Sequence, residues 1–280
     1  MLGGSAEFAP TFAIPPVVLP RKAPGLHVPE GPAAIPFARR VSSPAVVPPR
    51  PRIRKTPSRP VSRFQQLLAA GQPVVEPEGN LRPAYLRIKR ALDVLGALVL
   101  LVLLSPAMLT AYLVLWITTR GRPMFCRVRL GWCGRPFLMY KFRTMALNAQ
   151  RRQHEVVNEQ TGPVFKNRRD PRVTWFGRIL RRTSLDETPQ LLNVLAGQMS
   201  LVGPRPPLAK EVAQYEPWQR RRLAVKPGLT CIWQVSGRSE IGFEDWARMD
   251  LRYVRHQALA ADLGLLLRTP WSVLTGRGAY

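Results

Sequence analysis

Two adjacent carboxylates, Asp186 and Glu187, are the residues best suited to chemistry, and they follow two arginines in the segment RRTSLDETPQ. An acidic side chain among arginines and helix N-terminal amides stays ionised and nucleophilic, and the same donors attract a phosphoryl group. The segment also has a purely structural interpretation, because Ser184 and Glu187 have the spacing of a capping box. From the residues alone, capping and catalysis are equally open.

Several basic residues elsewhere could bind the anion that such a carboxylate would attack. Arg205 stands between rigid prolines in Gly203-Pro204-Arg205-Pro206, and an arginine held this way loses little entropy on binding a phosphate. Arg238 follows a turn glycine in a weaker pattern of the same type. Lys141 and Arg143 either reach the same anion or serve as membrane-surface charges. None of these patterns is specific by itself, since each also fits a solvent-facing residue.

The motifs that the chain lacks narrow the chemistry further. The sequence contains neither G-x-G-x-x-G nor G-x-x-x-x-G-K-[ST], which excludes the familiar nucleotide-binding loops. It also has no His-rich or Cys-rich cluster with metal-ligand spacing. Any metal would therefore be an oxygen-bound ion such as Mg²⁺, held by carboxylate and substrate phosphates.

Composition points to an anionic partner. The 280 residues include 42 Lys and Arg against 17 Asp and Glu, a formal charge of +25. Nucleic acid, an anionic membrane face and a phosphorylated substrate all fit this charge. A hydrophobic share of 46% excludes a wholly disordered basic protein. The three cysteines lack C-x-x-C spacing and are typical of reduced cytoplasmic thiols.

The elements that must position these residues begin after a proline-rich arm. Residues 1–80 hold sixteen of the 29 prolines, a density that no helix or central strand tolerates. We therefore predict a disordered arm, partly in polyproline II conformation, which either serves as a linker or docks to a partner as a peptide. Its first twenty residues lack the basic start of a secretory signal.

A long apolar segment follows, from Ala91 to Ile117, with basic residues on both flanks. It is long enough to cross a bilayer as a tilted helix. However, Ser105-Pro106 interrupts its middle, and basic residues on both sides do not give the one-sided bias of a simple span. These features favour a re-entrant hairpin over a span, and both over a buried core helix.

The rest of the chain predicts a mixture of short strands and helices. Residues 121–145 favour strands or a hairpin with turns at Gly131 and Gly134, and residues 146–169 a loop or exposed helix. Helices are expected near 176–182, 189–195, 209–225, 243–257 and 259–274.

Read together, five motifs resemble the bacterial sugar transferase family of monotopic phosphoglycosyl transferases. They are KFRTM from Lys141, RTSLDE from Arg182, PQLLNVL from Pro189, MSLVGPRP from Met199 and KPGLT from Lys226. The resemblance covers about residues 85–280, and the ordered set is highly specific. The arm stays outside it.

The resemblance implies transfer of a sugar 1-phosphate from a UDP-sugar to a polyprenyl phosphate, usually undecaprenyl phosphate, with release of UMP. This step initiates bacterial exopolysaccharide, capsule or O-antigen synthesis. Asp186 matches the nucleophile of a phospho-aspartyl intermediate and a ligand of Mg²⁺, and Glu187 its dyad partner. The matching phosphate-binding or supporting positions are Lys141, Arg143, Arg181, Arg205, Arg238 and Asp250, the last of which would orient a basic residue or the metal shell.

The same resemblance implies the fold and the location. We expect an α-rich α+β, monotopic membrane domain, with a disordered arm at 1–80, a re-entrant helix hairpin at 85–119 that breaks at Ser105 and Pro106, and a catalytic domain at 120–280. The catalytic domain would face the cytoplasm at the bacterial inner membrane, in contact with membrane lipids and with downstream glycosyltransferases as further candidate partners. Two departures are visible: Cys231 replaces a frequent glycine, and residues 257–261 lack tryptophans that many members have.

Two competing classes of function explain less of the sequence. A membrane-tethered nucleic-acid-binding protein would account for the aromatic and basic residues of 121–143 but gives the carboxylate pair no role. We therefore expect no nucleic-acid partner. A non-enzymatic membrane scaffold would need no carboxylate pair either, and release of UMP from a UDP-sugar separates it from an enzyme. The turn at 236–239 weakly favours a hexose such as glucose or galactose over an N-acetylated sugar.

Overall fold

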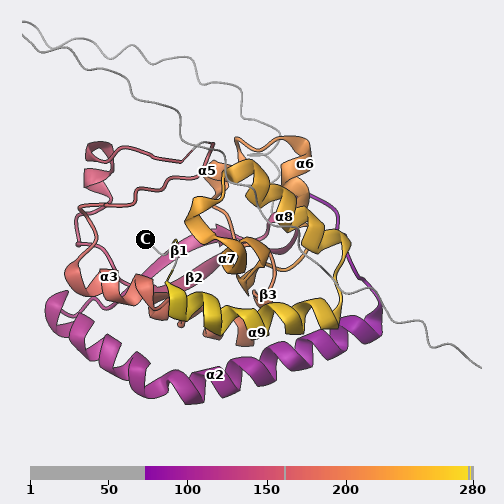
Figure 1. Cartoon of the computed structure of the whole chain (residues 1–280), viewed down its shortest axis with the longest axis horizontal. Coiled ribbons are helices and arrows are strands. Elements are labelled where there is room, and N and C mark those ends of the chain that lie inside the picture. The colour runs from indigo at the N-terminus through magenta and orange to yellow at the C-terminus, as the bar shows by residue number, and fades with distance from the viewer. Residues whose placement is uncertain (1–72, 161, 277, 279–280) are drawn as a thin grey trace, which may run out of the picture. The chain divides into compact units, whose positions relative to one another are not determined.

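The longest element is an apolar helix, α2 (Pro83–Thr118), which runs along one edge of the folded region in Figure 1 and is bowed near its middle. The computed structural model describes residues 73–160, 162–276 and 278, so the predicted arm lies almost wholly outside the described residues. Within that part of the chain, α2 is the one helix long and apolar enough to cross a membrane. Most of its middle is exposed, as expected of a surface in contact with lipid.

The Ser105-Pro106 pair lies inside this helix rather than between two helices, so α2 is continuous where a break was predicted. Proline has no amide hydrogen and leaves the carbonyl four residues earlier, that of Val102, without its helical partner. The Ser105 hydroxyl donates to that same carbonyl at 2.8 Å. The serine hydroxyl thus replaces the hydrogen bond that the proline removes. The proline itself accounts for the bow in α2.

Both halves of α2 pack against the same domain. In the first half, Lys89 binds Asp262 at 2.9 Å, and the Asp93 carboxylate accepts hydrogen bonds from the Ser200 hydroxyl at 2.9 Å and the Leu201 amide at 3.0 Å. In the second half, Ala111 and Leu115 are buried in a cluster with Phe142 and Leu180. Both halves of the helix therefore contact the domain, and most of the middle of the helix is exposed.

An antiparallel hairpin follows α2, as predicted. Strands β1 (Met124–Leu130) and β2 (Pro136–Phe142) pair in register from Met124 with Phe142 to Leu130 with Pro136. The connection is a short 3-10 turn, η1 (Trp132–Gly134), in which Gly134 has a φ of +82°. A positive φ favours glycine, which explains how the sequence marks this turn.

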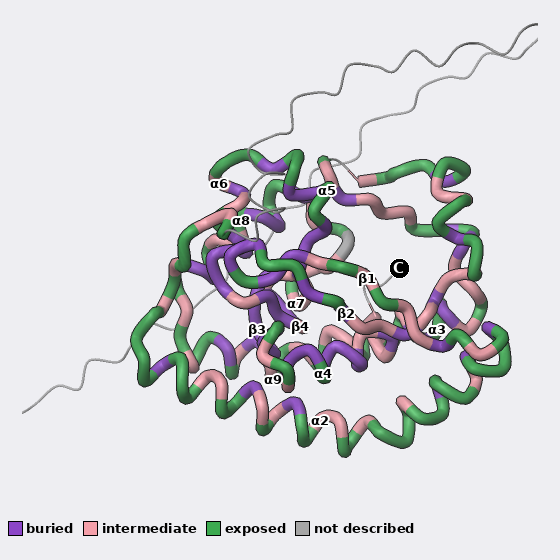
Figure 2. Tube along the Cα trace, turned by 180° about the vertical axis from the view of Figure 1, so that it is seen from behind, coloured by how far each residue is buried: buried purple, intermediate pink, exposed green. Residues whose placement is uncertain are grey.

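A second sheet of two parallel strands lies in the core. Strands β3 (Ser200–Val202) and β4 (Gly228–Thr230) pair directly, and Figure 2 shows buried residues gathered around them. The backbones of Gly203 and Gly228 meet so closely that a Cβ on Gly228 would clash with the Gly203 amide. This close approach fixes the start of the loop that carries Arg205.

Five further helices complete this part of the fold: α3 (Trp175–Arg182), α4 (Gln190–Leu195), α7 (Ile232–Ser236), α8 (Phe243–Arg255) and α9 (Leu259–Thr275). All of them except α7, which was not predicted, agree closely with the predicted helices. The long helix predicted for 209–225 is wrong. That stretch forms α5 (Ala209–Val212), α6 (Pro217–Arg220) and the 3-10 turn η4 (Arg221–Ala224), because Pro217 can start a helix but not continue one. The predicted loop at 146–169 contains one short 3-10 turn, η2 (Arg151–Glu155), and another, η5 (Arg238–Glu240), follows α7.

The last residues of the predicted arm are attached to the domain. The Val74 amide donates to the Cys133 carbonyl at 2.8 Å, the Glu78 amide donates to the Ala224 carbonyl at 3.2 Å, and Glu78 forms an ion pair with Arg221. Residues 73–80 are therefore part of the fold, which differs from the predicted boundary of the arm at residue 80.

Candidate active site

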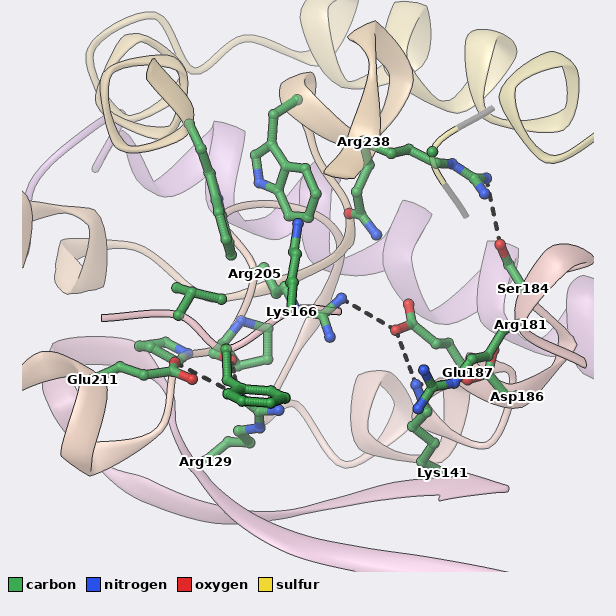
Figure 3. Close-up of a pocket in the computed structure, with 18 of the residues that line it drawn as sticks. Arg129, Lys141, Lys166, Arg181, Ser184, Asp186, Glu187, Arg205, Glu211 and Arg238 are labelled. Atoms are coloured by element: carbon green, nitrogen blue, oxygen red, sulfur yellow. Dashed lines mark hydrogen bonds and ion pairs between the residues drawn. The ribbon is translucent and has the colours of Figure 1, made fainter. Parts of the chain in front are cut away.

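The two adjacent carboxylates lie in a 3-10 turn, η3 (Leu185–Glu187), that directly follows α3. Ser184 precedes the turn in the left-handed conformation, with a φ of 56°, and its side chain caps no helix amide. Of the two interpretations that the segment left open, the capping box is therefore the one that the structure contradicts. A serine at positive φ is unfavourable by itself and persists where its surroundings impose it. The reversal at Ser184 directs Asp186 and Glu187 into a pocket of about 250 Å³ (Figure 3).

Two cations from distant parts of the chain meet this carboxylate pair. Lys141, near the end of β2, lies 2.6 Å from Asp186 and 3.5 Å from Glu187. Arg205, in the loop after β3, lies 3.2 Å from Glu187. Asp186 is only 2% exposed, so its charge depends on these partners rather than on water.

Burial and these cations move the two acids apart in pKa. Burial raises the pKa of Asp186, although Lys141 and Arg181 oppose this shift. Burial would raise the pKa of Glu187 too, but Arg205 and Lys141 outweigh it and hold that pKa well below its usual value. Glu187 is therefore a fixed negative charge that holds the two cations, while Asp186 is the less solvated, more reactive carboxylate.

Two more predicted arginines line the same pocket. The Arg181 side chain donates from Nε to the Thr144 hydroxyl at 3.1 Å, and that of Arg238 donates to the Ser184 hydroxyl at 3.4 Å. Gly177 lets α3 approach this region, since a Cβ there would clash with the Thr144 carbonyl. Together with Lys141 and Arg205, these side chains surround the carboxylates with four cations.

The pocket also contains Lys166, a residue that no sequence pattern marked. The ammonium of Lys166 is buried, has no hydrogen-bond partner among the described residues, and lies 5.1 Å from the Trp233 ring and 5.2 Å from the Trp246 ring. Burial lowers its pKa to about 8. Figure 3 shows it with Arg205 between the carboxylates and the far end, where Arg129 and Glu211 lie. Its place in an irregular loop gave no periodic signal.

Two predicted site residues do not line the pocket. Arg143 follows the end of β2 and donates to the carbonyls of Arg122 and Met124 instead. Asp250 is buried in α8 and pairs with Arg222 at 2.5 Å. Arg222 does line the pocket, so Asp250 contacts a basic residue of the site rather than the site itself. The sequence could have indicated that Asp250 is buried inside the fold, because it lies four residues from Trp246 and from Val254 and so shares their apolar helix face.

The carboxylate pair suits a divalent ion only in part. The described residues contain no group of three or more His, Cys, Asp or Glu side chains placed to hold a metal. However, Mg²⁺ is commonly held by one or two carboxylates together with substrate phosphates. Asp186 and Glu187 therefore fit a Mg²⁺ ion that binds with a diphosphate.

Comparison with known proteins shows to which family a chain with this pocket is similar. The family model described as "Bacterial sugar transferase" matches residues 84–276. The chain is 40% identical over 200 residues to "Galactosyl transferase CpsE" of Streptococcus agalactiae, a match covering 70% of this chain and 44% of that protein. It is 40% identical over 204 residues to "Undecaprenyl-phosphate galactose phosphotransferase" of Salmonella typhimurium, covering 69% of this chain and 42% of that protein.

A shorter relative matches over almost its whole length. "Exopolysaccharide production protein ExoY" of Rhizobium meliloti is 37% identical over 220 residues, which is 76% of this chain and 97% of the relative. The chain thus spans less than half the length of the first two relatives and nearly all of the third. The region matched by the family model contains α2 from its second residue, the hairpin, and every residue that lines the pocket except Gly278.

Proposed function

Because this chain belongs to the bacterial sugar transferase family, we propose that it transfers a sugar 1-phosphate from a UDP-sugar to a polyprenyl phosphate such as undecaprenyl phosphate, with release of UMP. The observation that carries the proposal is a buried carboxylate, Asp186, in a pocket where Lys141, Arg181, Arg205 and Arg238 offer positive charge to a diphosphate. The names of the relatives agree with it, since one is a galactose phosphotransferase using undecaprenyl phosphate and another serves exopolysaccharide production.

In the first step, a carboxylate oxygen of Asp186 attacks the phosphorus next to the sugar. A bond forms between that oxygen and phosphorus, and the bond from phosphorus to the bridging oxygen breaks. UMP leaves with the bonding electrons, and Arg205 and Lys166 lie where they can offset its growing charge. Fixed cations in a partly dry pocket stabilise such a leaving group without reorganisation.

In the second step, an oxygen of the polyprenyl phosphate attacks the same phosphorus. The bond between phosphorus and Asp186 breaks, which restores the carboxylate and leaves a sugar diphosphate on the lipid. Dividing the reaction in this way lets one small pocket serve a water-soluble donor and then a lipid acceptor. Glu187 stays ionised throughout and holds Lys141 and Arg205 in place.

A Mg²⁺ ion would be held by Asp186 and Glu187 together with the donor phosphates. When bound, it would neutralise charge on the diphosphate. The protein's own cations carry out the positioning described above.

The same proposal includes a re-entrant membrane helix on the cytoplasmic face of the inner membrane. Its support is that both halves of α2 pack on one domain, while large apolar side chains in the middle, such as Val102 and Leu103, are 75% and 70% exposed. Exposed apolar residues of α9, such as Leu267 and Trp271, extend this surface. An active site held at headgroup depth meets a lipid-linked phosphate directly.

The decisive test uses a donor labelled in the phosphate next to the sugar and no acceptor. Label should remain on the denatured protein, map to Asp186 and be released by hydroxylamine. Asp186→Asn should abolish labelling and turnover, because the amide is isosteric but a poor nucleophile. The matched control is Asp245→Asn, an exposed acid on α8 outside the pocket. Full activity in the Asp186 variant would refute the covalent mechanism, and a screen of UDP-sugars would identify the donor.

A further inference from the structure

A second cavity, of about 510 Å³, adjoins the pocket described above. Three residues line both cavities: Asn167, Asp170 and Arg181. Figure 3 shows Arg181 beside the carboxylate pair. The second cavity therefore adjoins the first on the side of Asp186 and Glu187, through residues around Arg181, and Lys166 does not line it.

Four further arginines line this second cavity, which we call the α3 basin. Arg168 and Arg169 come from the loop before Asp170, and Arg178 and Arg182 come from α3. Asp170 is the one carboxylate among the lining residues, and it already forms an ion pair with Arg172 at 2.6 Å. The basin is thus strongly positive. Arginines gathered around a cavity are well suited to a phosphate, which accepts hydrogen bonds from several guanidinium groups.

The helix that carries two of these arginines also has exposed apolar residues. Trp175 is 69% exposed and Ile179 is 43% exposed, and they lie one turn apart on α3, three residues before Arg178 and Arg182 respectively. Exposed tryptophan beside arginine is typical of a surface at a membrane interface. Leu180, on the buried face of α3, belongs to the same cluster as Leu115 of α2, so the helix that lines the basin lies beside the apolar helix.

We propose that the α3 basin receives the phosphate of the lipid-linked acceptor, a phosphate monoester on an apolar chain, and delivers it to Asp186 beside Arg181. The inference rests on the proposed function and adds a separate entrance for the second substrate. The donor then occupies the pocket between Asp186 and Lys166, while the acceptor approaches from the membrane side along α2 and α3. UMP can leave without crossing the path of the lipid.

The test separates the two half-reactions in purified full-length protein in detergent. Labelled protein is formed with donor alone and is then discharged with increasing amounts of a short-chain polyprenyl phosphate. Arg169→Ala combined with Arg178→Ala should raise the acceptor concentration for half-maximal discharge at least about tenfold, the effect of losing one charged hydrogen bond. Formation of the labelled protein should stay within about twofold, because neither residue lines the donor pocket. Arg248→Ala, which breaks an exposed pair with Glu244 on α8, should change neither step.

Two further experiments identify the ligand of the α3 basin. Discharge by inorganic phosphate as efficient as by the lipid, or equal competition by vesicles of an ordinary anionic phospholipid, would overturn the proposal in favour of a general anion site. Unchanged discharge in the double variant, or an equal fall in both half-reactions, would overturn it too. Binding of a fluorescent short-chain polyprenyl phosphate to Asp186→Asn needs no chemistry. If adding Arg169→Ala and Arg178→Ala to this variant weakens binding, the acceptor site in the α3 basin is supported. This holds even if no labelled protein can be formed, because the absence of labelled protein would refute only the covalent mechanism.

Discussion

Lys141 bridges Asp186 and Glu187, with its ammonium 2.6 Å from the first carboxylate and 3.5 Å from the second. The lysine belongs to β2 and the acids to the turn after α3, so a single cation connects the hairpin to the proposed nucleophile. Because Asp186 is buried, this contact does more than an exposed ion pair would. It opposes the burial that raises the pKa of Asp186.

Removing this cation should move the acidic limb of the pH-rate profile. In Lys141→Met, the pKa of Asp186 rises further because the cation that opposes the effect of burial is lost, so the carboxylate becomes ionised only at higher pH. We expect kcat/KM for UMP release to fall at neutral pH and to recover partly at alkaline pH. Lys141→Arg keeps the charge and should keep the limb near its original position. An unshifted limb in the Met variant would show that Lys141 does not control the ionisation of Asp186.

Lys166 should make donor binding sensitive to alkaline pH. Burial lowers its pKa to about 8, so its ammonium is charged below that pH and becomes neutral above it. We expect the KM for the UDP-sugar to rise as pH passes through about 8. Lys166→Arg should keep a low KM beyond that point, since its guanidinium stays charged, whereas Lys166→Met should have a raised KM at every pH. Equal pH dependence in all three proteins would exclude this role.

Much of the fold follows from local pattern. The hairpin, α3, α4, α8 and α9 are each marked by turn glycines, helix periodicity or proline starts, and these signals act over a few residues. The attachment of residues 73–80, in contrast, depends on contacts with Ala224, Cys133 and Arg221. Contacts between residues so distant in sequence leave no local pattern.

The site shows the same division. Asp186, Glu187, Lys141 and Arg205 were identified from motifs, but the local pattern left Glu187 equally open to a capping role, because its actual partners lie 46 and 18 residues away. Arg143 is two residues after Lys141, a spacing that would place both on one face of a strand. However, β2 ends at Phe142, so the alternation no longer applies at Arg143 and its side chain turns away.

The topology of α2 can be tested by labelling. With native cysteines replaced, single cysteines at Leu81 and Asn148, which are both exposed, should react with an impermeant probe from the cytoplasmic side only. Pro106→Ala restores a backbone hydrogen bond and removes a steric bend, so part of the population should become labelled from opposite sides. Opposite labelling in the unmodified helix would mean that α2 spans the membrane.

A buried polar cluster should stabilise the first half of α2. Asp262 accepts hydrogen bonds from Tyr253 at 2.7 Å and Tyr85 at 3.3 Å and pairs with Lys89. Asp262→Asn leaves the ammonium of Lys89 poorly compensated, which should lower the free energy of unfolding by about 1–3 kcal/mol. Thermal unfolding in detergent measures this change. Glu244→Gln, which removes an exposed pair with Arg248, serves as the control and should have little effect. Equal Tm values for the two variants would assign the cluster no stabilising role.

α2 is attached to the domain near both ends, by the ion pair of Lys89 with Asp262 near its start and by the buried Leu115 near its end. A helix held at one end would let the domain tilt about that joint. Held at both, it resists tilting, because rotation about either attachment strains the other. The distance from the exposed apolar middle of α2 to Asp186 is then fixed by the fold. In the proposed reaction, this distance sets how far the phosphate of the lipid acceptor must move to reach Asp186.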